Sequence, residues 1–284
     1  MSLIADAPES LSAPAAAPVA GAVHLSRVER SFVMPEGRRE VLRDLTVDLA
    51  AGEIVAVVGP SGCGKSTLLR LIAGLDAPTG GSIVIDGAPV RDTDERTAVA
   101  FQEPRLLPWR TLAQNVELGL PRDHPRRERA ERVAELLSLV GLGHAADQRP
   151  REVSGGMAQR ASLARALARN PEVLLLDEPF GALDALTRLR MQDLLLDIHA
   201  AEPTTVLLVT HDVEEALYLA DRVLLLRSLV AEPDAEAASI ARTITVPGVR
   251  PRDRADRALA DLRAELLEGL GVDTHHYTPS EETR

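Results

Sequence analysis

One short segment limits the possible folds of this chain more than any other. The letters GPSGCGKST occupy positions 59–67; an apolar run, Ile54–Val58, precedes them and a stretch with helical periodicity, Ser66–Ala73, continues from them. They fit the pattern G-x-x-x-x-G-K-[ST], in which a glycine-rich turn joins a buried strand to a helix. Such a turn lets successive backbone N–H groups point inward, where the helix N-terminus adds positive potential for phosphate. The segment therefore predicts an α/β fold with a phosphate-binding loop.

This loop contains the only lysine of the chain, because all the other basic residues, 32 in total with Lys65, are arginines. An ammonium group is compact and fits between phosphates, whereas a guanidinium group is a wide planar fork. We expect Lys65 to reach the β- and γ-phosphates of ATP, Ser66 to bind Mg²⁺ and Thr67 to hold the region of the α-phosphate. The remaining nucleotide-binding residues predicted in the loop are Gly59, Pro60, Ser61, Gly62, Cys63 and Gly64.

The rest of the chain alternates between strand and helix patterns. Alternating apolar and polar residues at Val23–Asp48, interrupted at Pro35–Arg39, predict antiparallel strands. Further strands are predicted at Ser82–Asp86, Ala98–Phe101, Val173–Leu176, Val206–Val209, Val223–Leu226 and Ile244–Val246, and helices at Thr187–Ile198, Val213–Leu219 and Arg257–Leu267. This order predicts a mostly parallel sheet with helices on both faces, beside a smaller antiparallel subdomain.

We divide the chain into four parts on composition and periodicity. Residues 1–22 are rich in alanine and proline and are predicted to be a disordered tail, and residues 23–230 form the main domain. A helical subdomain is predicted as an insertion at about 106–168, where apolar residues recur at helical spacing. Residues 231–270 are a strand and helix extension, and residues 271–284 are a second disordered tail.

Four polar residues follow predicted strands, at the edge where ligands bind in open α/β sheets. Asp177 is expected to act on Mg²⁺ through its water shell, and Glu178 to polarise the attacking water. His211 is placed to hydrogen-bond the γ-phosphate and to keep Glu178 in register, while Gln102 offers an amide oxygen to Mg²⁺. Together with the loop, this set predicts hydrolysis of ATP, with Lys65, Glu178 and His211 as the catalytic residues.

Composition excludes several other classes of protein. The formal net charge of -11 and the 2% aromatic content argue against a nucleic-acid surface. Cys63 is the single cysteine, which fits a reducing cytoplasm and gives no cysteine-based metal site. No apolar run reaches the length of a membrane span. The pair His275 and His276 is a weak metal signal in the C-terminal tail.

The segment Val153-Ser154-Gly155-Gly156-Met157 resembles the signature of the ABC transporter ATPases, and the motifs occur in the order of that family. The resemblance covers about Val23 to Leu270 and implies a P-loop NTPase core of the ABC type. It also implies a head-to-tail homodimer with ATP between the subunits, in which Ser154, Gly155 and Gly156 meet the γ-phosphate held by the partner. Asp184, in the run Gly181-Ala182-Leu183-Asp184, would couple the two sites.

Three features of the sequence leave alternatives open: two residues of the signature, one aromatic residue and one segment. Val153 and Met157 stand where the family more often has leucine and glutamine, which puts the rate and the nucleotide affinity in question. Phe32 is either the aromatic residue that stacks on adenine or a core strand residue. The segment Phe101–Val116, with the only tryptophan, Trp109, is either a socket for a permease helix or simple packing of the insertion.

The segments 101–116, 181–198 and 244–270 are most similar to the ATPases of aliphatic sulfonate importers. This resemblance implies two permease subunits, an extracytoplasmic sulfonate-binding protein and a peripheral position at the cytoplasmic face of the inner membrane. Importers of taurine, nitrate or another small oxyanion are alternatives, as are a regulatory module without hydrolysis and a soluble ABC protein acting on nucleic acid. No nucleic-acid partner is expected, because the charge is acidic.

Overall fold

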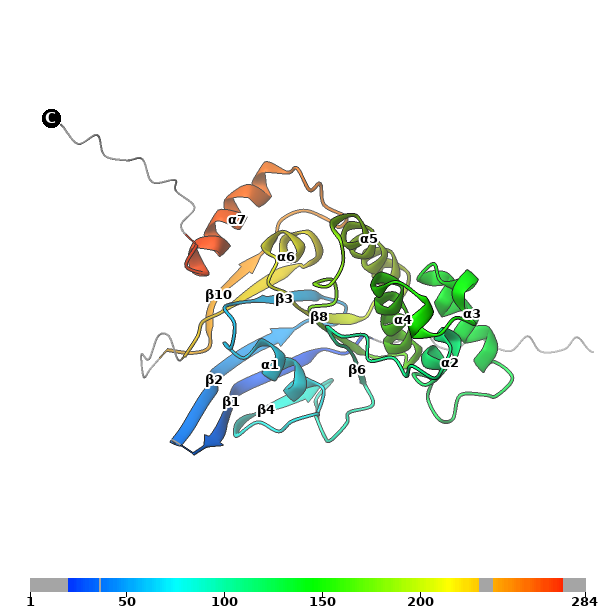
Figure 1. The fold of residues 1–284 in the computed structure, drawn as a ribbon. Coiled ribbons are helices and arrows are strands. Elements are labelled where there is room, and N and C mark those ends of the chain that lie inside the picture. The colour runs from blue at the N-terminus through cyan, green and yellow to red at the C-terminus, as the bar shows by residue number, and fades with distance from the viewer. Residues whose placement is uncertain (1–19, 36, 230–236, 273–284) are drawn as a thin grey trace, which may run out of the picture.

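The computed structural model describes residues 20–35, 37–229 and 237–272 (Figure 1). The predicted tails at 1–22 and 271–284 and the predicted boundary at 230 therefore lie largely outside the described residues, as do His275 and His276. Gly21, assigned to the tail, contacts the domain: its N–H donates to Glu172 O at 3.2 Å, and its carbonyl accepts from Thr205 Oγ1 at 2.7 Å. The segment that is hydrogen-bonded to the domain thus begins before β1, whose first residue is Val23.

The larger sheet has six strands in the order β10-β9-β3-β8-β7-β6. Neighbouring strands from β9 to β6 are parallel, and β10 pairs antiparallel with β9 at the edge. The strands are β3 (Ile54–Val58), β6 (Thr97–Ala100), β7 (Val173–Asp177), β8 (Thr205–Val209), β9 (Arg222–Leu226) and β10 (Ile240–Thr245). The predicted mostly parallel sheet is confirmed, and β10 begins four residues before the predicted Ile244.

The smaller sheet is antiparallel, with the order β2-β1-β4-β5. Its strands are β1 (Val23–Met34), β2 (Gly37–Leu49), β4 (Gly80–Ile85) and the short β5 (Ala88–Pro89). In Figure 1, α1 (Lys65–Ile72) lies between the two sheets. Leu68, Leu69 and Leu71 of α1 belong to the core that both sheets share, which confirms the predicted antiparallel subdomain on the α/β core.

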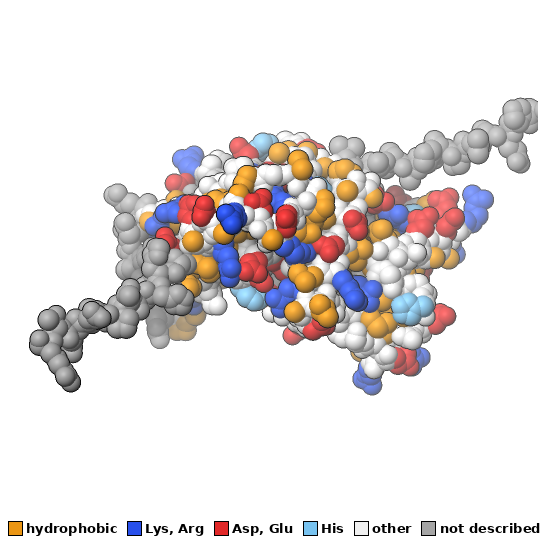
Figure 2. Space-filling view, turned by 90° about the horizontal axis from the view of Figure 1, so that it is seen from above, with side chains coloured by type: hydrophobic (Ala, Val, Ile, Leu, Met, Phe, Trp, Pro, Cys, Tyr) orange, Lys and Arg blue, Asp and Glu red, His pale blue; other side chains and the backbone are white. Residues whose placement is uncertain are grey.

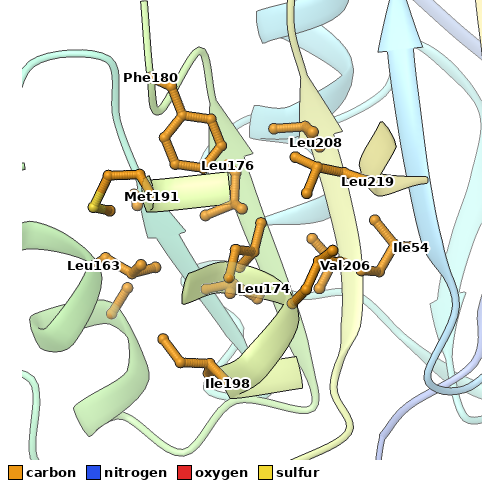
Figure 3. Close-up of a cluster of buried hydrophobic side chains, with 14 of the residues drawn as sticks. Ile54, Leu163, Leu174, Leu176, Phe180, Met191, Ile198, Val206, Leu208 and Leu219 are labelled. Atoms are coloured by element: carbon orange, nitrogen blue, oxygen red, sulfur yellow. The ribbon is translucent and has the colours of Figure 1, made fainter. Parts of the chain in front are cut away.

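Alternate residues of the parallel strands face two different cores. On β3, Val55 and Val57 belong to the core around α1, whereas the other three residues belong to the core under the remaining helices. Figure 3 shows this second core, where Leu174 and Leu176 of β7 lie beside Val206 and Leu208 of β8. Burial on both faces explains why these strands are continuous apolar runs in the sequence.

The helices on the second face are α4 (Gly155–Ala168), α5 (Ala185–Ala201), α6 (Val213–Leu219) and α7 (Arg257–Gly269). Two further helices, α2 (Leu112–Glu117) and α3 (Arg129–Leu139), pack with α4 to form a helical group at one end of the molecule (Figure 1). None of the helices in the described ranges is both long and apolar enough to cross a membrane.

Helix α2 begins six residues after the start predicted for the helical subdomain. The side chain of Asn115, fully buried, accepts from Leu107 N–H at 2.7 Å and donates to the carbonyls of Leu107, Arg110 and Thr111. Thr111 then caps α2 in a reciprocal pair of hydrogen bonds with Gln114. Residues 106–111, called the Trp109 loop below, are consequently held by hydrogen bonds to the helix that follows them.

Figure 2 views the molecule from the side on which α7 lies. Acidic, basic and hydrophobic side chains are intermixed over the coloured part of this face. Among the described residues seen there, no broad basic area is present of the kind that binds nucleic acid.

Candidate functional site

The candidate site lies where three neighbouring parallel strands end. Strands β3, β8 and β7 are adjacent in the sheet, so the segments that follow Val58, Val209 and Asp177 meet at one edge. These segments carry the glycine-rich loop, His211 and Glu178. The carboxyl edge of an open parallel sheet is where ligands bind in α/β proteins.

The loop needs glycine at particular positions. Gly62 and Gly64 have φ values of +79° and +105°, in the left-handed region that other residues avoid. A Cβ atom at Gly59 would lie 2.7 Å from both Cys63 Sγ and the carbonyl oxygen of Leu226, and one at Gly64 would lie 2.6 Å from Leu42 Cδ2. Only glycine fits this curvature, which forms the cradle that a phosphate group requires.

Lys65 is the first residue of α1 and lies over the loop. Its Nζ donates to the carbonyls of Gly59 at 2.7 Å and Pro60 at 3.1 Å. Pro60 and Ser61 are exposed at the turn, whereas Cys63 is buried, and this burial raises the pKa of the Cys63 thiol. Cys63 therefore supports the loop as a small apolar side chain, while Lys65 and the backbone are left to meet a ligand.

Ser66 and Asp177 are brought together from positions far apart in the sequence. Ser66 Oγ donates to Asp177 Oδ1 at 3.0 Å. Burial raises the pKa of Asp177, and the hydrogen bond from Ser66 opposes this rise. A hydroxyl and a carboxylate oxygen beside a phosphate cradle are the hard donors that Mg²⁺ prefers, so the residues present fit a magnesium ion.

Glu178 joins two of the other predicted residues. Its Oε2 accepts from Gln102 Nε2 at 3.2 Å and lies 3.2 Å from His211 Nδ1. The backbone at Glu178 has a φ of +46°, and its N–H donates to Val209 O at 2.8 Å. A positive φ is costly for a glutamate and is concentrated at functional sites. The arrangement places a carboxylate with one imidazole and one amide partner at the mouth of the loop.

The predicted residues of the signature and the predicted coupling residue Asp184 lie at two exposed helix N-termini. Ser154 caps α4 by accepting from Met157 N–H at 3.3 Å, and Asp184 caps α5 by accepting from Thr187 N–H at 3.0 Å. The hydrogen bonds from Thr187 lower the pKa of Asp184. A Cβ atom at Gly156 would lie 3.0 Å from Thr187 Cγ2, so the two helix starts are in contact.

These groups are not joined to the loop by any hydrogen bond within the described parts of the chain. Ser154, Gly155 and Asp184 are exposed to solvent at these helix starts. Val153 and Met157, the two departures from the family signature, are half-buried and pack against the apolar core of the helical group.

Phe32 is not a core strand residue. Its side chain is on β1 and is 36% exposed, with the guanidinium carbon of Arg30 at 4.4 Å from the ring centroid. The alternative of core packing is therefore wrong, because an exposed ring with a cation over one face is no part of either buried cluster. The ring is available to a planar ligand group.

Sequence reasoning did not identify the residues that hold the segment after Gln102. Gln159 is buried on α4, and its Nε2 donates to Phe101 O at 3.1 Å. The guanidinium of Arg165 donates to the carbonyls of Pro104 and Arg105, each at 2.8 Å. The signal was a glutamine among the small and apolar residues of α4, but its partner is 58 positions away and no local pattern reveals it. Thus α4, which begins at the signature, also fixes the segment at Gln102.

Comparison with known proteins finds similarity to ATP-binding proteins of ABC transporters. The family model described as ABC transporter matches residues 42–181. The chain is similar to the aliphatic sulfonates import ATP-binding protein SsuB of Granulibacter bethesdensis, with 52% identity over 88% of this chain and 94% of that protein. It is also similar to SsuB 1 of Streptomyces avermitilis, with 50% identity over 93% and 92% of the two chains.

A solved structure of a dimeric ATP-binding cassette, in a post-hydrolysis state bound to ADP and Pi, resembles the fold. The TM-score is 0.70 at 33% identity, over 80% of this chain and all of that one. The same cassette in a second dimeric structure gives a TM-score of 0.69 at 32% identity.

Proposed function

The chain belongs to the ABC transporter family, as an ATP-binding and ATP-hydrolysing subunit, and we propose that it powers the import of aliphatic sulfonates. The observation that carries the substrate class is the 52% identity to a protein named for aliphatic sulfonates import, over 94% of that protein's length. The match covers 88% of this chain and so extends beyond residues 42–181, which match the general family.

The residues of the loop are proposed to bind the triphosphate. Backbone N–H groups of the loop after Pro60 and the ammonium of Lys65 would hold the β- and γ-phosphates, and Thr67 the α-phosphate. Ser66, Asp177 and Gln102 would hold Mg²⁺, which neutralises phosphate charge when bound. The hydrogen bonds from Lys65 to the carbonyls of Gly59 and Pro60 keep the ammonium at the loop.

Glu178 is proposed to act as the base that polarises the attacking water. Its carboxylate accepts from Gln102 and contacts His211, so two hydrogen-bond partners fix the orientation of one of its oxygens. The second oxygen, Oε1, is then the one available to accept a water proton. His211, whose side chain is 61% exposed, can reach beyond Glu178 toward a bound phosphate.

A head-to-tail homodimer is proposed to complete each site. Ser154, Gly155 and Gly156 form an exposed helix N-terminus that would meet the γ-phosphate bound by the partner. Asp184, at the start of the adjoining helix α5, would couple the two nucleotide sites of the dimer. The two dimeric cassette structures to which the chain is similar support a dimer. Phe32, with Arg30 over one face, is proposed to stack on adenine with the other.

A groove next to Gln102 is proposed to receive a cytoplasmic segment of the permease. It has a volume of about 330 Å³ and is lined by residues that include Leu75, Phe101 and Leu118. Leu75 and Leu118 are about half exposed, and Trp109 nearby in the sequence is 67% exposed. Such exposed apolar groups fit docking of an apolar helix. Two permease subunits and an extracytoplasmic sulfonate-binding protein would then place this subunit at the cytoplasmic face of the membrane.

The experiment is uptake of a labelled alkanesulfonate by cells that carry the importer with the parent chain or with Glu178→Gln. We expect uptake with the parent and a loss of at least tenfold with the variant. Unlabelled taurine and nitrate are added as competitors to test the alternative substrates. Uptake of the labelled alkanesulfonate that is no higher with the parent chain than in cells without the importer, or that taurine or nitrate suppresses at lower concentrations than unlabelled alkanesulfonate does, would overturn the sulfonate assignment.

A further inference from the structure

A second concave site lies in the helical group, apart from the loop. It is a pocket of about 780 Å³ between α2, the following segment and α3. Six of its lining residues, called the polar side below, are polar or charged: Gln114, Glu117, Arg122, His124, Arg126 and Arg129. The other lining residues, called the floor below, are small or aliphatic: Ala113, Ala130, Val133, Ala134, Leu137 and Ala146. The pocket is therefore amphipathic, with about half of its lining apolar.

The polar side has an excess of positive charge, in contrast to the acidic chain as a whole. Arg122 and Arg126 form no ion pair with any residue in the described ranges, and Arg129 donates to the backbone carbonyls of Pro121 and Arg122 instead of a carboxylate. Glu117 is the single acidic residue against three arginines in the lining. The N-terminus of α3, an 11-residue helix that begins at Arg129, adds further positive potential.

His124 provides an independent observation at the same place. It lines the pocket, and its Nε2 is buried without a hydrogen-bond partner in the described parts of the chain. An unpaired buried polar atom costs free energy that a partner would recover. His124 thus lies in the lining beside the arginines, with a hydrogen-bonding nitrogen that the described residues do not use.

We propose that this pocket binds a small soluble anion with one oxyanion head and a short alkyl chain. The head would be a sulfonate, sulfate or carboxylate on Arg122 and Arg126, because guanidinium groups match the geometry of planar and tetrahedral oxyanions. The chain would lie on the apolar floor of α3. A polyphosphate fits less well, because it has no group for this floor and Glu117 opposes additional negative charge. A bound anion would contact both α2, which follows the Trp109 loop, and α3.

The inference does not depend on the substrate of the importer. Alkanesulfonates belong to the same chemical class, so an imported substrate could also occupy this site, and only that link rests on the proposed function. Binding is measured on the purified full chain without permease and without nucleotide, so a failure of the sulfonate assignment in uptake assays would leave this test unaffected.

The test is calorimetric titration with hexanesulfonate. We expect saturable binding to one site, at least tenfold tighter than binding of methanesulfonate, inorganic phosphate or hexyltrimethylammonium. Arg122→Gln with Arg126→Gln should weaken the binding at least tenfold. Arg127→Gln is the matched control, because this neighbouring arginine is exposed and does not line the pocket; its affinity should stay within twofold of the parent.

A second variant, Ala134→Glu, tests the floor while all the arginines remain, and it should also weaken binding at least tenfold. The proposal is overturned if hexanesulfonate does not bind, if the control and the double variant bind equally, or if the cationic probe binds as tightly as the sulfonate. Binding of anionic phospholipid vesicles, but not of hexanesulfonate, through Arg122 and Arg126 would also overturn it, because the site would then be a membrane contact.

Discussion

Glu178 combines a left-handed backbone, at φ +46°, with hydrogen-bond contacts from two other strand ends. If its carboxylate is the general base, Glu178→Gln should lower the ATP turnover number by at least about a hundredfold, which is the lower range of such catalysis. The affinity for ATP should stay within about threefold, because the loop is unchanged. Phosphate release and nucleotide titration measure the two quantities. Glu131→Gln, an exposed glutamate on α3, is the control, and parent-like turnover in Glu178→Gln would remove the role given to this residue.

Lys65 allows a second test of a single residue. Its ammonium reaches the carbonyls of Gly59 and Pro60 within a loop that has no room for added atoms at two glycines. Lys65→Arg keeps the charge but introduces a wide planar group. We expect ATP affinity to fall at least tenfold, about 1.4 kcal/mol. Arg70→Lys, on the same helix, makes the reverse exchange and should leave nucleotide affinity unchanged. Tight binding by Lys65→Arg would mean that charge alone matters at this position.

The site residues differ in how far the sequence could predict them. Lys65, Asp177, Glu178 and His211 follow strands of recognisable apolar pattern, so the sheet geometry predicts their common location. Gln159 and Arg165 could not be predicted, because they bind backbone carbonyls about 60 positions away. Backbone carbonyls belong to every residue type and leave no trace in the sequence.

At the scale of elements, Asn115 connects α2 to the loop before it. Asn115→Ala would leave Leu107 N–H without its side-chain acceptor and would remove one hydrogen bond from each of three carbonyls, of which those of Leu107 and Thr111 keep a backbone donor. Leaving buried polar groups unpaired costs about 1–3 kcal/mol each, so we expect the free energy of unfolding to fall by at least about 2 kcal/mol in denaturant titrations. Gln114→Ala, exposed on the same helix, removes only half of the capping box and should cost under about 1 kcal/mol. Equal losses in the two variants would contradict the role of Asn115 as the support of the Trp109 loop.

Helix α6 contains a carboxyl group that should make stability depend on pH. Burial raises the pKa of Glu215 to about 7, while the hydrogen bonds from Thr210 and Gln192 oppose this rise. The unfolded chain protonates Glu215 only near its ordinary value of 4.5, so folding takes up a proton between about pH 4.5 and 7. The contribution of Glu215 to the free energy of unfolding is therefore highest below pH 4.5 and falls as pH rises to about 7, by on the order of 3 kcal/mol.

Glu215→Gln should remove this fall, because the amide stays neutral and can keep a hydrogen bond to Thr210. Thermal unfolding from pH 5 to pH 8 of the parent and the variant measures the difference, which should grow with pH in favour of the variant. Glu214→Gln, the neighbouring exposed residue, is the control. Parallel curves for Glu215→Gln and the parent would show that Glu215 does not titrate in this range.

Strands and helices could be predicted where an apolar run or a helical periodicity of apolar residues was the main signal. The buried strands β3, β7 and β8 and the helices α5 and α6 agree with their predicted positions within a few residues. The start of α2 differed because tertiary hydrogen bonds to Asn115 stabilise the loop 106–111 against the helical periodicity of its sequence. The early start of β10 differed because its pairing with β9 extends to Ile240 and is set by the neighbouring strand.

At the scale of the whole molecule, the exposed starts of α4 and α5 predict that ATP joins two chains. In the Glu178→Gln background, where bound ATP is not consumed, we expect ATP with Mg²⁺ to give a species of about twice the 30.5 kDa of one chain in light scattering. Adding Ser154→Arg should keep the protein monomeric, because the long side chain would occupy the helix N-terminus that meets the partner's phosphate. Ser138→Arg, an exposed serine on α3, makes the same change away from the interface and should leave the dimer intact. Dimers that form equally in both arginine variants would place the interface elsewhere, and the signature would then have no role between subunits.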